Sequence, residues 1–119
     1  MVGVAFKPGT DDMRESPYVI VARRLIEEGI AARVYDPGVH PERLIGSNRE
    51  LVRRALGSLE QVLVHSLDEL IECDIILVNH PIITSGDLSK WLSSGIRVID
   101  LVGIDGVARD AAGYEGICW

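Results

Sequence analysis

The sequence predicts an α/β fold: a Rossmann-like, three-layer sandwich in which helices cover both faces of a parallel sheet. Short apolar runs that do not alternate with polar residues, such as 75–78, are typical of strands buried on both faces. Amphipathic segments of helical period separate these runs. Right-handed crossovers then favour five strands in the order 3-2-1-4-5. At 119 residues the chain fits one domain, spanning 1–119.

A strand, a helix and a second strand are expected in the first third of the chain. Apolar residues between positions 2 and 6 predict a buried first strand. Segment 17–28 has helical period and gathers apolar side chains on one face. Ser16 is a suitable N-cap for this helix, and Gly29 is suited to its C-terminal end. The second strand, 32–35, ends at an Asp-Pro-Gly turn.

The rest of the chain repeats this alternation. Two capping boxes, Ser47–Glu50 and Ser66–Glu69, are expected to open helices. Further apolar runs predict strands at 62–64, 75–78 and 97–102. Segment 87–92 has helical character, and no convincing period follows from Gly103 onward.

Composition restricts the classes of function. The formal net charge is -6 with acidic and basic residues interspersed, which argues against a nucleic-acid surface. No apolar stretch reaches the roughly 18 residues of a membrane span, and no signal-peptide pattern is present. Cys73 and Cys118 lack metal-ligand spacing, so no metal site is expected, and a reducing, cytoplasmic setting suits them. No Ser/His/Asp, Cys/His or paired-carboxylate arrangement indicates a catalytic centre.

The first loop brings two cations to the edge of the sheet where ligands bind. In an open parallel sheet, ligands bind beyond the carboxyl ends of the strands, where the strand order reverses. That point lies between the loop of Lys7 and Arg14 and the loop of Asn79 and His80. Two cations there suit a phosphorylated ligand, and the His80 imidazole is expected to face the same crevice. A plainer interpretation makes Lys7 a solvated lysine and Arg14 the partner of neighbouring carboxylates.

A dinucleotide fingerprint is missing from this loop. No G-x-G-x-x-G sequence is present, so a complete NAD site is not expected in the chain. Asp36, at the end of the second strand, stands where a ribose-binding acid would be. Without the glycines we interpret it as a turn-forming residue.

Two segments carry a resemblance to a known family. They are Phe6-Lys7-Pro8-Gly9-Thr10-Asp11-Asp12-Met13-Arg14-Glu15-Ser16-Pro17 and Glu115-Gly116-Ile117-Cys118-Trp119. The first resembles the signature that opens the C-terminal domain of the UDP-glucose/GDP-mannose dehydrogenases. The second resembles the chain end of the GDP-mannose branch. Asp100-Leu101-Val102-Gly103 also resembles that branch, whereas the UDP-glucose branch usually has Asp-Gly-Arg there.

The resemblance implies roles for three residues. It implies that Phe6 and Lys7 contact the nucleotide-sugar and that Arg14 reaches NAD bound on an N-terminal domain. It implies an oxidoreductase that converts GDP-mannose to GDP-mannuronate with two NAD, in polysaccharide precursor synthesis. The family's NAD-binding domain and catalytic cysteine lie upstream of this domain. The chain alone is therefore expected to be inactive, and the whole protein to be a homo-oligomer.

Two alternatives stay open at this point. One is the C-terminal domain of a UDP-glucose-type dehydrogenase. The other is a stand-alone nucleotide-binding or regulatory module with a degenerate Rossmann-like sheet.

Overall fold

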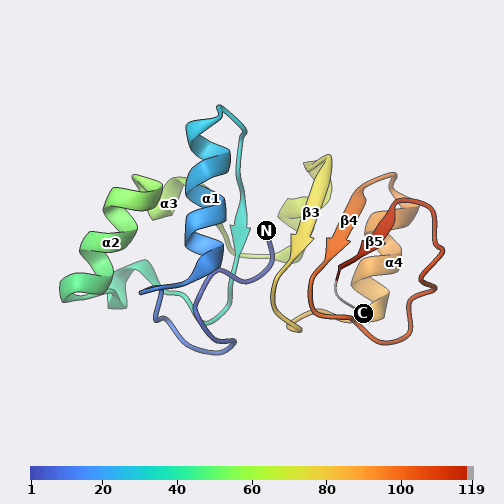
Figure 1. The fold of residues 1–119 in the computed structure, drawn as a ribbon, viewed down its shortest axis with the longest axis horizontal. Helices are drawn as coiled ribbons and strands as arrows, with labels where there is room; N and C mark the ends of the chain where they lie inside the picture. Colours follow the sequence, from blue (N-terminus) through green and yellow to red (C-terminus); the bar gives the residue numbers. More distant parts are fainter. Residues whose placement is uncertain (118–119) are drawn as a thin grey trace.

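Parallel strands run through the middle of an elongated domain that measures 43 × 26 × 24 Å (Figure 1). The structure is a computed structural model and describes residues 1–117. Its helices are α1 (Pro17–Glu27), α2 (Gly46–Leu56), α3 (Leu59–Val62) and α4 (Ser85–Ser93), with 3-10 turns η1 (Pro41–Arg43) and η2 (Leu67–Glu72). Its strands are β1 (Val34–Tyr35), β2 (Leu63–Val64), β3 (Ile75–Val78), β4 (Arg97–Asp100) and β5 (Tyr114–Gly116).

The strands form two parallel groups that Val2 joins. One group pairs β1 with β2, and the other has the order β3-β4-β5. Val2 makes isolated parallel bridges to both Tyr35 and Val78, so it lies between the two groups. The α/β class and the parallel direction are therefore as expected, but the prediction of one five-stranded sheet in the order 3-2-1-4-5 is wrong, because the strands form one group of two and one group of three.

Two local features explain this difference. The expected first strand shrinks to Val2 because Gly3 has a φ of 88°, which turns the chain out of extended conformation. β5 was not expected, because only Tyr114 of its three residues is buried and no apolar run marks it.

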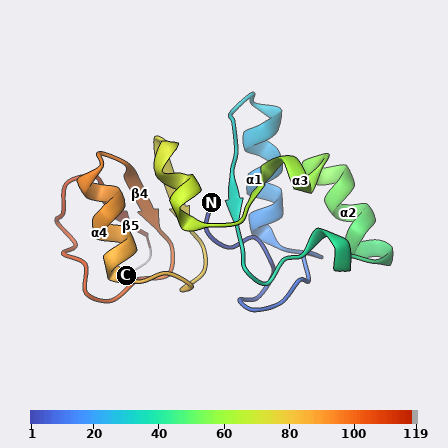
Figure 2. The ribbon, with the colours of Figure 1, turned by 180° about the vertical axis from the view of Figure 1, so that it is seen from behind.

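Alternation along the strands produces two apolar cores, one on each face. Val34 and Leu63 pack with α1, α2 and α3, whereas their neighbours Tyr35 and Val64 pack on the opposite side. That opposite core also contains Trp91 of α4, which is 1% exposed. Figure 2, seen from behind, shows α4 and the η2 segment in front of the strands, with α1 behind them. Helices therefore lie on both sides of the strands, with α1, α2 and α3 on one side and α4 with η2 on the other.

The helix N-termini confirm two of the three expected capping residues or boxes. Ser16 caps α1, its Oγ accepting from Tyr18 N–H at 3.2 Å, and the Ser66 capping box precedes η2 as expected. The Ser47 box is wrong, because α2 begins at Gly46 with no side-chain cap. A box of Thr84 with Asp87, not anticipated, starts α4 before the expected residue.

Three further expectations concern single residues or the whole chain. Cys73 is a free thiol, half-buried against the second core, and Cys118 lies outside the described residues. Within residues 1–117, no helix combines the length and hydropathy needed to cross a bilayer. The same part of the chain holds no cluster of three His, Cys, Asp or Glu side chains suited to a metal ion.

Candidate functional site

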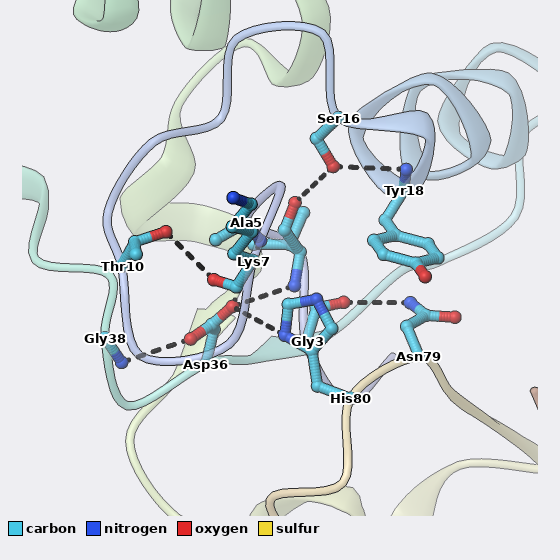
Figure 3. Close-up of polar contacts among 11 residues, drawn as sticks. Gly3, Ala5, Lys7, Thr10, Ser16, Tyr18, Asp36, Gly38, Asn79 and His80 are labelled. Atoms are coloured by element: carbon cyan, nitrogen blue, oxygen red, sulfur yellow. Dashed lines mark hydrogen bonds and ion pairs between the residues drawn. The ribbon is translucent and has the colours of Figure 1, made fainter. Parts of the chain in front are cut away.

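A buried carboxylate holds the base of the first loop. Asp36 Oδ2 accepts hydrogen bonds from the backbone N–H groups of Val4 at 2.9 Å and Ala5 at 3.1 Å (Figure 3). Its Oδ1 accepts from Gly38 N–H at 3.1 Å, which is the turn contact expected from the sequence. Asp36 is 4% exposed. The predicted role of Asp36 as a turn residue therefore accounts for one of its three hydrogen bonds. The other two join Asp36 to residues 31 and 32 positions earlier in the sequence.

Side chains from three other elements hold the same loop. Asn79 donates through Nδ2 to the Gly3 carbonyl at 2.8 Å, and Ser16 Oγ donates to the Val4 carbonyl at 2.7 Å. Asn48 of α2 accepts from Met13 N–H and donates to the Asp11 carbonyl, at 3.1 and 2.8 Å. The predicted approach of the Lys7 and Asn79 loops is therefore present at their bases. A loop tied at both ends keeps its tip in a defined place.

The Asp36 contact also explains what replaces the missing glycine motif. In a dinucleotide fold, backbone N–H groups after the first strand and at the helix N-terminus bind the pyrophosphate. Here the N–H groups of Val4 and Ala5 are buried and already satisfied by Asp36. These two donors are therefore not available to an anion.

Phe6 and Lys7 lie further along the same loop. The Phe6 ring is 49% exposed, while its N–H is fixed by the Asp12 carbonyl at 2.8 Å. Lys7 is exposed, and within the described residues its ammonium forms no ion pair. Its carbonyl accepts from Thr10 Oγ1 at 2.9 Å, which closes the turn (Figure 3). The backbone of this loop is ordered by hydrogen bonds, and its aromatic ring and cation are left for solvent or a ligand.

Arg14 is paired within the loop. Its Nε and Nη2 donate to Asp12 Oδ1 and Oδ2 at 2.9 and 2.8 Å, a two-point contact. This guanidinium lowers the pKa of Asp12 to about 2. The neighbouring Glu15 has a φ of 58°, a left-handed conformation that is uncommon for a residue with a side chain. The plainer interpretation of Arg14 therefore describes this structure, and a ligand would have to displace Asp12 to engage it.

His80 does not face the crevice, contrary to expectation. It is 2% exposed, and its ring lies over Gly3, where a Cβ atom would come within 2.4 Å of it. Tyr18 packs edge-on against the ring at 5.3 Å between centroids. Both ring nitrogens lack hydrogen-bond partners, with Nδ1 at 3.8 Å from Asp36 Oδ2. His80 therefore fills space beneath the loop and is not placed to touch a ligand.

The environment of His80 predicts a pH dependence of stability. Burial lowers the pKa of His80, and the Asp36 carboxylate opposes that shift only in part. The unfolded chain therefore takes up a proton near pH 6.5 that the folded chain takes up only at lower pH. The free energy of unfolding is expected to fall as pH drops below about 6.5, by at most about 1.4 kcal/mol per pH unit for one proton.

The matched comparison is His80→Phe, followed by urea denaturation between pH 7.5 and 5. The Met1 amine, whose pKa burial lowers to about 6, contributes in the same direction in both proteins and cancels. A pH slope that is identical in the two proteins would contradict the prediction.

The loop that follows β4 carries a cation that was not anticipated. The sequence analysis found no arginine directly after the fifth expected strand. The structure shows Arg109 in the loop that follows β4, lining a shallow hollow with Gly103 and Tyr114. Arg109 lies nine residues past the end of β4, outside the segment directly after the strand in which the UDP-glucose branch has its arginine.

These features define a Rossmann-like α/β domain in which a buried carboxylate occupies the backbone donors that follow the first strand. Comparison with known proteins gives the family. The model of the UDP-glucose/GDP-mannose dehydrogenase family, UDP binding domain, matches residues 1–104, and the chain belongs to this family.

Similar relatives come from the GDP-mannose branch. Over 120 residues and the whole of this chain, it is 36% identical to a GDP-mannose 6-dehydrogenase of Pseudomonas aeruginosa and 35% identical to one of Azotobacter vinelandii. A crystal structure of a ternary complex of GDP-mannose dehydrogenase from Pseudomonas aeruginosa matches 99% of the chain with a TM-score of 0.76 and 36% identity. The chain spans 27% of the length of each of these relatives.

Proposed function

We propose that this chain is the nucleotide-sugar-binding domain of a GDP-mannose 6-dehydrogenase. The observation that carries the proposal is the first loop: Asp36 occupies its backbone donors, while Phe6 and Lys7 extend outward at the ligand-binding edge. The identity of 35–36% over the whole chain to enzymes of that activity supports the choice of branch.

Each loop residue has a defined part in this proposal. The Lys7 ammonium donates to a phosphate or sugar oxygen of GDP-mannose, since it is a strong point-charge donor. Phe6 provides apolar contact beside it. Arg14 exchanges Asp12 for NAD, which is held mainly by a part of the protein outside residues 1–119. NAD would accept the electrons from the sugar, and this chain supplies one cation towards it.

The whole protein is proposed to oxidise GDP-mannose to GDP-mannuronate with two NAD, in the cytoplasm and as a homo-oligomer. We assign its catalytic cysteine to a part of the protein outside this chain, as the family resemblance implies; Cys73 packs half-buried against an apolar core. The chain alone should therefore produce no NADH from NAD and GDP-mannose. Measurable turnover by residues 1–119 would contradict this division of roles.

The substitutions Lys7→Ala and Arg14→Ala in the full-length enzyme separate the two roles. Lys7→Ala is expected to raise the KM for GDP-mannose about tenfold to a hundredfold, because a charge-assisted hydrogen bond contributes about 1.5–3 kcal/mol. Arg14→Ala is expected to raise the KM for NAD by a similar factor. Steady-state kinetics with each substrate varied in turn measures both effects.

Lys90→Ala is the matched control, since Lys90 is an exposed cation paired with Asp68 on a different element. It should leave both KM values unchanged. Equal losses towards both substrates in both loop variants would show that the loop has only a structural role.

A UDP-sugar specificity is the second candidate. It is favoured by a local match of 47% identity over 45 residues, 38% of the chain, to a UDP-glucose 6-dehydrogenase of Drosophila melanogaster. Calorimetric titration of the full-length protein with GDP and with UDP distinguishes the two. We expect tighter binding of GDP. A preference for UDP would show that the protein has the specificity of the UDP-glucose dehydrogenases.

A further inference from the structure

We infer that Asn48 is a positioning residue for the NAD side of the first loop, because its side-chain amide fixes the backbone that carries Arg14. The inference rests on the proposed function, in which Arg14 reaches NAD, and extends it by naming the group that places this cation. Asn48 belongs to α2, and its amide contacts the loop backbone at Asp11 and Met13. Asn48 acts through Arg14, without a direct contact to NAD.

The Asn48 amide makes a two-point contact with the loop. Its Oδ1 accepts from the Met13 N–H at 3.1 Å, and its Nδ2 donates to the Asp11 carbonyl at 2.8 Å. One acceptor and one donor of the same side chain thus match one donor and one acceptor of the backbone. Met13 is 0% exposed, so water has little access to replace the bond to its N–H.

α2 uses Asn48 for the loop and not for its own N-terminus. Asparagine near the start of a helix ordinarily satisfies free N–H groups of that helix. Asn48 is the third residue of α2, yet the helix has no side-chain cap. Both bonds of the amide go to residues 35 and 37 positions earlier in the sequence. The contact is therefore tertiary, and it joins α2 to the first loop.

The two anchored residues lie on either side of Asp12, which is the partner of Arg14. Asp12 accepts from the Arg14 backbone N–H at 3.0 Å and from its guanidinium at 2.9 and 2.8 Å. When the guanidinium leaves Asp12 for NAD, it moves from a backbone that Asn48 already holds in place. Fixing that backbone beforehand lowers the ordering cost of binding.

The conformation of Glu15 shows that this segment needs an anchor. Its φ of 58° lies in the left-handed region, and such a residue persists there only where its surroundings hold it. Asn48 holds the chain before it, at Met13. Ser16 Oγ holds the chain after it through the bond of 2.7 Å to the Val4 carbonyl (Figure 3). Without the Asn48 amide, we expect the backbone around Glu15 to relax.

The Lys7 side of the loop has supports of its own. Asp36 accepts from the two N–H groups at the start of the loop. The Phe6 N–H donates to the Asp12 carbonyl at 2.8 Å, and Thr10 Oγ1 donates to the Lys7 carbonyl at 2.9 Å. None of these bonds involves α2, so loss of the amide should leave the Lys7 side in place.

A double-mutant cycle in the full-length enzyme tests whether Asn48 acts through Arg14. Asn48→Ala alone is expected to raise the KM for NAD about tenfold and to change the KM for GDP-mannose by less than about twofold. In an Arg14→Ala background, the same substitution should raise the KM for NAD no further, because the cation that it positions is absent. Steady-state kinetics of the four proteins, with each substrate varied in turn, gives these values.

Two further variants serve as control and replacement. Ser47→Ala, at the exposed residue before Asn48 on α2, is the matched control and should leave both KM values unchanged. Asn48→Ser takes the place of Asn48→Ala if the alanine variant does not fold. Serine is favoured near helix starts but is too short to bridge both backbone groups, so the same KM pattern is expected.

Two results would overturn the inference. One is an unchanged KM for NAD in the Asn48 variant while Arg14→Ala raises it. The other is an equal rise in both backgrounds, which would show that the substitution loosens the domain in general. An unchanged KM for NAD in Arg14→Ala itself would instead contradict the proposed function, and this inference with it, so the two failures are distinguishable.

Discussion

Replacing Asp36 with alanine is expected to lower the free energy of unfolding by about 2–5 kcal/mol, because it leaves buried backbone donors without an acceptor. The Val4 and Ala5 N–H groups lose their bonds of 2.9 and 3.1 Å, and no water has ready access to replace them at residues that are 0% exposed. The same change should loosen the base of the loop that carries Lys7. Urea denaturation measures the first effect, and amide hydrogen exchange at Val4 and Ala5 measures the second.

Two further variants sharpen this prediction. Asp74→Ala removes an exposed carboxylate next to β3 and should change stability by less than about 0.5 kcal/mol. Asp36→Asn keeps one acceptor oxygen and should fall between the wild-type chain and Asp36→Ala. If Asp36→Ala were as stable as Asp74→Ala, the hydrogen bonds that Asp36 accepts from Val4 and Ala5 would contribute nothing measurable to stability.

Replacing Asp100 with alanine is expected to be at least as damaging, with a loss of about 3–5 kcal/mol. Asp100 is 0% exposed and accepts four hydrogen bonds. They come from the N–H groups of Val102, Gly103 and Ile104 and from the Tyr114 hydroxyl, at 2.8–3.0 Å. The carboxylate thus orders the loop after β4 and ties it to β5. Burial, followed by this hydrogen bond, raises the pKa of Tyr114 to about 12.

Tyr114→Phe isolates one of the four bonds. It should cost about 1.5–3 kcal/mol, since the acceptor is charged, and leave the three backbone bonds in place. Hydrogen exchange at Val102–Ile104 should accelerate in Asp100→Ala but not in Tyr114→Phe. Equal stability losses in the two variants would show that the backbone bonds contribute little.

The candidate site could be predicted only in its outward-facing part. Lys7 and Arg14 were proposed as site residues because their loop follows an apolar run and precedes a capped helix, and both signals are local. Phe6 was proposed from the family resemblance alone. The sealing of the loop by Asp36 depends on residues 31 and 32 positions away, and no local pattern reports such a contact. His80 was misplaced for a related reason. Its position after β3 was correct, but whether a side chain turns outward depends on space, here the space left by Gly3.

By itself the sequence determined the α/β class, the parallel direction of the strands and the loop that brings Lys7 to the sheet edge. Hydrophobic period and helix capping depend on residues that are close together in the sequence, so both can be predicted without the tertiary structure. Only the tertiary structure decided that Gly3 ends the first strand after Val2 and that Asp36 occupies the backbone donors that follow it. Each of these depends on which distant groups meet, and burial and backbone hydrogen bonding across the sheet settle that question.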